Sequence, residues 1–183
     1  MMRKRTVGLA LLFLLLNVFV AVACGRQEKP TEELDDGTSG FSFEFSLWVN
    51  PEQKNIWSTE KKRIQKDLVF NGVAGADWTI TKKDLAEVES LIREYQVTQM
   101  KEEIDQYLAT AETFSFEYPD TIFELSFFLD GQRYSVSFPF GVLKGIPKDD
   151  SRYKYNEFFD KLFAILEGQG VYKNLPESSG GYN

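Results

Sequence analysis

Residues 41–49 read FSFEFSLWV, and apolar and polar side chains alternate strictly along this stretch. A period of two is typical of a β-strand that buries one face, so the stretch predicts a strand in a sheet packed on one side. Asn50 and Pro51 are residues that end such a strand. The expected buried face holds Phe41, Phe43, Phe45, Leu47 and Val49, and the expected open face holds Ser42, Glu44, Ser46 and Trp48.

A second strong strand signal lies near the C-terminal third of the chain. Ile122–Leu129 and Arg133–Phe140 flank Asp130-Gly131, and Asp-Gly favours a two-residue hairpin turn because both central residues need positive φ. Residues 122–129 are apolar on both faces, which predicts a central strand covered twice. The alternation of Phe114, Phe116 and Tyr118 predicts a further strand before this hairpin.

The segment between residues 56 and 80 carries weaker signals. Residues 59–65, TEKKRIQ, predict an exposed or edge strand, where lysines discourage further pairing. Asn71-Gly72 predicts a turn, and Trp78 with Ile80 predicts a short strand after it.

Three segments have helical periodicity. Thr81 is the expected N-cap of a helix whose buried stripe includes Val88, Ile92 and Tyr95, and residues 100–111 repeat the pattern less clearly. A third helix is predicted from Ser151 to a left-handed cap at Gly168.

The order of these elements predicts an α+β fold, in which an antiparallel sheet of about five to six strands has two or three helices packed on one face. We expect a single domain over residues 41–176 and a disordered tail over residues 177–183, where serine and glycine are frequent.

The N-terminus is typical of a bacterial lipoprotein signal peptide. Arg3, Lys4 and Arg5 precede an apolar run that ends in Ala-Val-Ala-Cys, and Cys24 is the only cysteine. Residues 1–23 are then cleaved, and Cys24 carries a diacylglyceryl group that anchors the chain in the membrane. Two alternatives remain open, a retained transmembrane helix over residues 7–23 and an ordinary secretory peptide.

The stretch that follows the predicted anchor has no apolar periodicity. Residues 24–40 hold the lipidated cysteine and the sequence GRQEKPTEELDDGTSG, which predicts a flexible linker. Cleavage after residue 23 changes the formal net charge from −7 to −10. Such an acidic chain repels phosphate backbones, so no nucleic-acid partner is expected. No cofactor or metal site is predicted, because histidine is absent and no acidic stretch has calcium-loop spacing.

Several short motifs resemble a group of uncharacterised small lipoproteins of Gram-positive bacteria. They are Lys-Asp-Leu at 66–68, TKKDLAEVESLIREY at 81–95, Leu-Pro-Glu at 175–177 and Gly-Gly-Tyr at 180–182. The resemblance implies a location on the outer side of the cell membrane but no reaction.

The leading functional hypothesis is a non-catalytic binding module at the cell surface that contacts a protein or peptide. Aromatic side chains dominate interface energetics, and four of them are the candidate contacts: Trp48, Trp57, Tyr153 and Tyr172. One exposed apolar patch around them would favour binding, and its absence would favour the alternative of a structural envelope lipoprotein.

An enzyme is not expected, and the third hypothesis is a hydrolase built on paired carboxylates. Glu44, Glu117 and Glu124 are acids on predicted strands, but their spacing selects no pair. Serine-hydrolase motifs are absent from the sequence.

Overall fold

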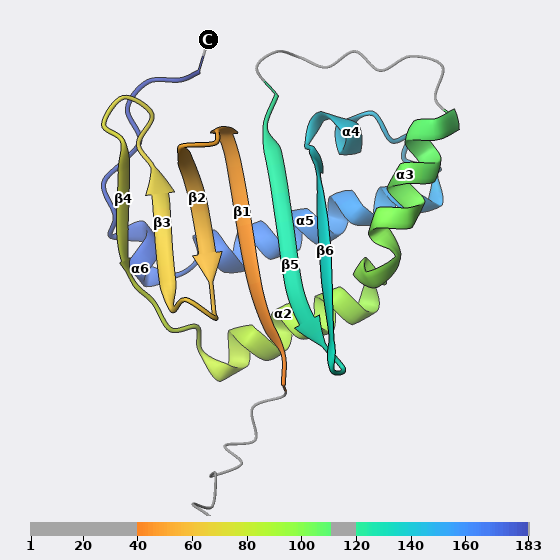
Figure 1. Cartoon of the computed structure of the whole chain (residues 1–183), viewed down its shortest axis with the longest axis horizontal. Coiled ribbons are helices and arrows are strands. Elements are labelled where there is room, and N and C mark those ends of the chain that lie inside the picture. The colour runs from red at the N-terminus through yellow and green to blue at the C-terminus, as the bar shows by residue number, and fades with distance from the viewer. Residues whose placement is uncertain (1–39, 111–119, 183) are drawn as a thin grey trace, which may run out of the picture. The chain divides into compact units, whose positions relative to one another are not determined.

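A six-stranded antiparallel sheet in the order β4-β3-β2-β1-β5-β6 organises the computed structural model, which describes residues 40–110 and 120–182 (Figure 1). The predicted α+β class is confirmed. The strands are β1 Ser42–Asn50, β2 Gln53–Ser58, β3 Arg63–Asp67, β4 Val73–Asp77, β5 Ile122–Leu129 and β6 Gln132–Pro139.

β1 lies in the interior of the sheet, and one of its faces is buried, as its alternation predicts. Phe43 and Phe45 are fully buried, while Glu44 and Trp48 lie on the opposite face and stay partly exposed. β1 pairs with β2 on one side and β5 on the other, so the strand with the strongest pattern joins the two halves of the sheet.

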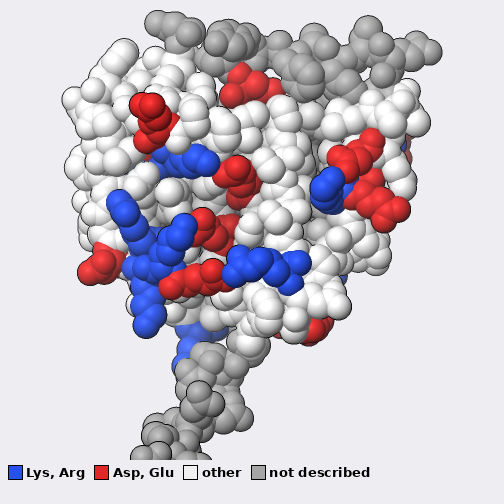
Figure 2. Space-filling view, in the orientation of Figure 1, with Lys and Arg blue, Asp and Glu red and all other residues white. Residues whose placement is uncertain are grey.

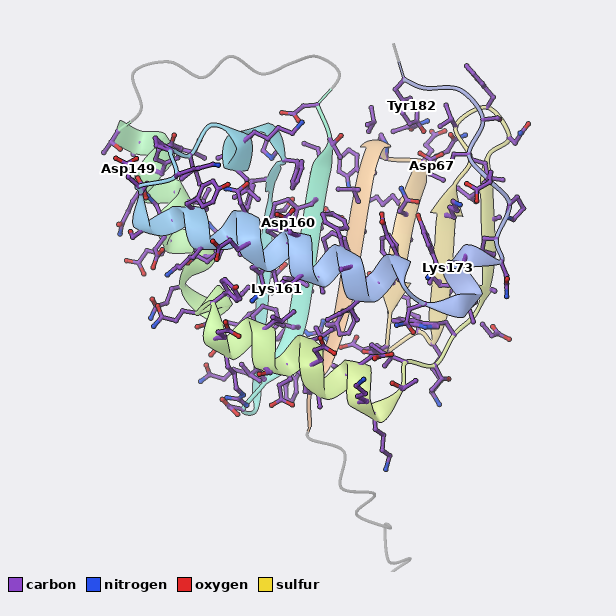
Figure 3. All side chains as sticks on the ribbon, turned by 180° about the vertical axis from the view of Figure 1, so that it is seen from behind. Asp67, Asp149, Asp160, Lys161, Lys173 and Tyr182 are labelled. Carbon is purple, nitrogen blue, oxygen red and sulfur yellow. The ribbon has the colours of Figure 1, made fainter. Side chains whose placement is uncertain are left out.

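The helices cover one face of the sheet and leave the other open (Figures 1 and 3). Thr81 caps α2 as predicted, because its hydroxyl accepts the N–H of Asp84 at 3.1 Å. The helical segments are α2 Lys82–Glu94, η1 Val97–Gln99, α3 Met100–Thr110, α4 Gly141–Lys144, η2 Ser151–Tyr153, α5 Lys154–Glu167 and α6 Gly170–Lys173.

The core lies between α5 and the inner face of the sheet and is mainly aromatic. The ring of Phe159 lies 4.4 Å from that of Phe123 and 6.1 Å from that of Phe45. Burial of each such ring contributes about 1.5–3 kcal/mol to the stability of the fold. This burial stabilises a chain whose single cysteine cannot form an internal disulfide.

The β5–β6 hairpin forms as predicted, with φ of 51° at Asp130 and 78° at Gly131. The expectation that β5 is covered on both faces is wrong. Phe123, Leu125 and Phe127 are buried, but the alternate residues face the open side and are only half-buried. Among the described residues all helices lie on the other face, so no described helix covers Ile122 and Phe128.

Local predictions in the β3–β4 region and in α5 are wrong. β4 ends at Asp77, so Trp78 and Ile80 follow this strand and do not form a short strand of their own. Residues 59–62 form a turn, and the strand begins at Arg63 inside the sheet, because β4 pairs beyond it. The actual edge strand, Val73–Asp77, contains no lysine. Gly168 has φ of −64°, so α5 ends without a left-handed cap.

Residues 177–182 differ from the disordered tail predicted for 177–183. Their backbone and side chains make hydrogen bonds to the β3–β4 turn, described below, and these contacts offset the entropy cost of ordering the segment.

The predictions for the signal peptide, for Cys24, for almost all of the linker and for the strand at Phe114–Tyr118 fall outside the described residues. Within residues 40–110 and 120–182, no helix is both long enough and apolar enough to cross a membrane.

Candidate functional site

The open face of the sheet is polar and its charges are paired. Figure 2 shows acidic and basic side chains interleaved across it. Lys61 pairs with Glu44 at 2.8 Å and Lys54 pairs with Glu124 at 2.9 Å. The face of the sheet that no described helix covers is therefore exposed to solvent and carries ion pairs.

A hollow of about 190 Å³ lies on this face between β1, β5 and β6. It brings together Glu44 and Glu124, two acids that the sequence could not pair. Burial alone would raise the pKa of Glu44, but hydrogen bonds from Lys61 and Ser58 and the charge of Lys61 lower it below its usual value. The remaining lining residues are Ser46, Ser126, Ser135 and Ser137.

The pKa of Glu124 is lowered in the same way. Burial opposes the ionised form, but hydrogen bonds from Lys54 and Ser46 outweigh it. A glycoside-type hydrolase needs one carboxyl whose pKa is raised so that it can act as an acid. Glu44 and Glu124 do not meet this condition, and Glu117 lies outside the described residues.

The four predicted aromatic contacts do not form an exposed patch, which favours the structural alternative over binding through these four residues. Trp57 is 1% exposed and belongs to the core, where its ring lies 5.0 Å from that of Tyr172. Tyr172 is half-buried, and burial followed by the charge of nearby carboxylates raises its pKa to about 12. Tyr153 also packs on the core. Trp48 is half-buried, and the Lys54 Nζ lies 4.7 Å from the centroid of its ring. Trp57 is therefore wrong as a surface contact.

Residues 177–182 instead form a C-terminal clasp around residues 66–71. Tyr182 donates its hydroxyl to Oδ2 of Asp67 at 2.6 Å, and Figure 3 shows the two side chains together. The Ser179 N–H donates to the Leu68 carbonyl at 3.3 Å, and Lys66 pairs with Glu177 at 3.3 Å. The clasp thus joins the Lys-Asp-Leu motif to the C-terminal motifs.

The β3–β4 turn under the clasp, residues 68–72, has an unusual backbone. Val69 has φ of 62°, a conformation that is strained for a β-branched residue. The N–H of Val69 donates to Oδ1 of Asp67 at 2.7 Å, and the Asn71 amide donates to the Ser179 hydroxyl at 2.8 Å. The clasp and Asp67 therefore hold Val69 in a backbone conformation that a β-branched residue does not favour.

This turn displays Phe70, which is 75% exposed and is the most exposed large apolar side chain of the described residues. Its ring lies directly against Gly180, where an added Cβ would come within 2.0 Å of Phe70 Cε2. The ring of Phe70 therefore rests on the backbone of Gly180, whose φ of 86° favours glycine. Phe70 is not among the aromatic contacts predicted from the sequence, although its place directly before Asn71-Gly72 indicates a side chain in a loop.

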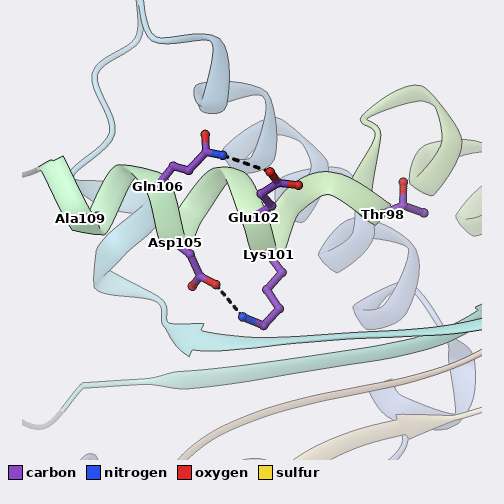
Figure 4. A pocket seen from close by; sticks show the side chains of 6 residues that line it. All are labelled: Thr98, Lys101, Glu102, Asp105, Gln106 and Ala109. Atoms are coloured by element: carbon purple, nitrogen blue, oxygen red, sulfur yellow. Dashed lines mark hydrogen bonds and ion pairs between the residues drawn. The ribbon is translucent and has the colours of Figure 1, made fainter.

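A surface groove of about 490 Å³ runs along η1 and α3 (Figure 4). Lys101 pairs with Asp105 at 2.6 Å and Gln106 donates to Glu102 at 3.2 Å. All its described lining residues come from this one segment and their polar groups satisfy one another, so the groove offers no group set apart for a ligand.

Comparisons with protein-family models, with curated proteins and with solved structures find no match. In the described part of the chain, no group of three or more acidic, cysteine or histidine side chains is arranged to hold a metal ion.

Proposed function

We propose that this chain is a lipid-anchored, extracytoplasmic binding module without catalytic activity, and that it contacts a protein or peptide partner through the β3–β4 turn. Phe70 replaces the four aromatic residues chosen from the sequence as the central contact. The observation that carries the proposal is the 75% exposure of this side chain. The turn that bears it is held by the hydrogen bond from the Val69 N–H to Asp67 and by that from the Ser179 N–H to the Leu68 carbonyl.

Two costs are concentrated at this turn. Leaving a phenylalanine in water forgoes about 1.5–3 kcal/mol of burial, and a backbone in a disfavoured region costs about 1–3 kcal/mol. Rigid, exposed aromatic side chains are typical anchors of interfaces, because little conformational entropy is lost when a partner covers them.

The position of the turn supports a surface role. β1 begins at Ser42 at one end of the sheet, and the β3–β4 turn lies at the opposite end, at the upper left of Figure 1. A chain anchored at Cys24 enters the domain through β1, so Phe70 is on the end of the domain far from that entry point.

The contact is tested with a photoreactive phenylalanine analogue placed at position 70 in the chain on intact cells of the native host. Val171, which is 36% exposed on α6, receives the same analogue as the matched control. We expect a discrete cross-linked product from position 70 that position 171 does not yield. Identical products at both positions, or no product at position 70, would exclude the turn as the contact surface.

The anchor has its own test. Mass spectrometry of the native N-terminus is expected to find a diacylglyceryl group on Cys24, and Cys24→Ser is expected to release the protein from the membrane fraction. An unmodified or unprocessed N-terminus would remove the lipoprotein part of the proposal and leave the contact surface to be judged by the cross-linking.

A further inference from the structure

We infer that the free edge of β4, beside Phe70, receives an extended, basic segment of the partner protein as an added antiparallel strand. This inference rests on the proposed function, because it states how the same corner of the domain binds. It commits to a peptide segment and not to a second copy of the chain.

The hydrogen bonds between β3 and β4 show which backbone groups of β4 remain free. The N–H of Trp78 donates to the Lys62 carbonyl at 2.8 Å, and the N–H of Leu68 donates to the Gly72 carbonyl at 2.9 Å. Antiparallel ladders alternate between bonded and non-bonded pairs, so the even-numbered residues of β4 bond to β3. The N–H and C=O groups of the odd-numbered residues point away from the sheet, and these residues are Val73, Gly75 and Asp77.

The exposure of β4 follows the same alternation. Val73, Gly75 and Asp77 are exposed, and the two alanines between them are half-buried. A Cβ added to Gly75 would lie 3.2 Å from the Ile64 carbonyl oxygen and 3.4 Å from the Arg63 guanidinium, so β3 leaves no room for a side chain at this position of the edge strand.

The two edges of the sheet differ in protection. Arg133 and Pro139 belong to β6, and α3 and α4 both contact that strand. Charged residues, proline and covering helices are the usual means of blocking strand addition. β4 reads Val-Ala-Gly-Ala-Asp and has neither lysine, arginine nor proline. Among the described residues, β6 is therefore protected against strand addition and β4 is not.

The charge of the chain selects the occupant. The formal net charge is −7, and Asp77 places a carboxylate on the free edge itself, with Arg63 opposite it in the β3–β4 register. A second copy would bring like charges together, and five residues of strand are far short of the roughly 1,000 Å² that a stable interface buries. A basic segment is attracted by the same charge, and an apolar side chain on it can cover Val73 and Phe70, which are 41% and 75% exposed.

The test uses the full chain in detergent micelles and a short synthetic peptide of alternating valine, threonine and lysine, blocked at both ends. Amide hydrogen exchange of the protein is the readout. The peptide is expected to slow exchange at the N–H groups of Val73, Gly75 and Asp77. The outward N–H groups of β6, at Arg133, Ser135 and Ser137, serve as the internal control and should not change.

Three peptide variants and one pair of protein variants examine the geometry and the charge of the contact. N-methylation of every second peptide amide is expected to weaken binding at least about tenfold for one parity and leave it unchanged for the other, because only alternate amides face the edge. Val73→Lys is expected to weaken binding, whereas Val171→Lys, the same change on α6, should not. Replacing the lysines of the peptide by glutamates should also weaken it.

The inference is overturned by no protection at β4 with peptide at about 1 mM, by equal effects of the two N-methylation parities, or by equal binding of the acidic peptide. Concentration-dependent self-association that Val73→Lys abolishes would likewise assign the edge to a second copy and overturn it. If β4 fails these tests while position 70 still cross-links to a partner, the proposed function stands without strand addition. If β4 is protected while position 70 does not cross-link, Phe70 is not the contact, but strand addition at the β4 edge is still supported.

Discussion

Tyr182 and Asp67 are joined by a hydrogen bond of 2.6 Å across 115 positions of the sequence. Asp67 uses its other carboxylate oxygen to accept the N–H of Val69, so one buried side chain holds both the C-terminal clasp and the strained turn. Burial, and then the hydrogen bond to Asp67, raises the pKa of the Tyr182 hydroxyl to about 12, which keeps it protonated as a donor at neutral pH.

Tyr182→Phe removes only the hydroxyl, and we expect it to lower the free energy of unfolding by about 1–2 kcal/mol. It should also speed amide exchange at Ser179, because the clasp loses its terminal contact. Tyr134→Phe is the matched control, since that hydroxyl bonds the exposed Gln132. Equal losses of stability in urea denaturation of both variants would contradict a special role for the Tyr182–Asp67 bond.

Val69→Gly tests the strain in the β3–β4 turn. Glycine adopts φ of 62° without a steric penalty, but it loses more entropy on folding, so we expect a net stabilisation of about 1 kcal/mol. Thermal unfolding measures the effect. Val73→Gly, in a β-strand, is the control and should be destabilising. A destabilised Val69→Gly variant would show that the turn is not strained.

Trp57 and Trp48 are expected to differ sharply on truncation. Trp57→Ala removes a side chain that is 1% exposed and should cost about 3–5 kcal/mol. Trp48→Ala removes a half-buried cover of the open face and should cost clearly less. Urea denaturation of the two variants decides the matter, and similar costs would mean that Trp48 is as much a core residue as Trp57.

Asp150 gives a prediction about pH. Hydrogen bonds from the Arg152 side chain and backbone lower the pKa of Asp150 from 3.8 to about 2. A carboxyl with a depressed folded pKa stabilises the protein above its unfolded pKa, and this contribution is lost as pH falls through the folded pKa. The stability difference between wild type and Asp150→Asn should therefore be constant near neutral pH, shrink below about pH 4 and disappear near pH 2.

Denaturation of wild type and Asp150→Asn at a series of pH values measures this difference. An Asp150→Asn difference that persists unchanged at pH 2 would show that the Arg152 contact does not depend on ionisation of the carboxyl.

Patterns confined to a few neighbouring residues were sufficient for much of the architecture. The alternation through Phe43 and Phe45, the Thr81 cap and the Asp130-Gly131 turn each depend on backbone geometry within a few positions, and the structure confirms all three. The two acids Glu44 and Glu124 were also recognised on strands, but their pairing in one hollow needed the strand order.

The errors arose where distant segments decide the local structure. The lysines of residues 59–65 predict an exposed or edge strand, because lysine is common on sheet edges. Pairing with β4 instead places β3 inside the sheet. β5 was expected to be covered twice, because its apolar residues do not reveal how many helix layers the chain can supply.

The sequence by itself determined the α+β class, the main hairpin, the Thr81 cap and the acidic charge, since each follows from periodicity, turn chemistry or composition. Only the tertiary structure decided where the C-terminus lies, how Val69 is held and why Phe70 is exposed. Those features depend on hydrogen bonds such as Tyr182–Asp67 between residues more than a hundred positions apart, and a local sequence pattern carries no information about such pairs.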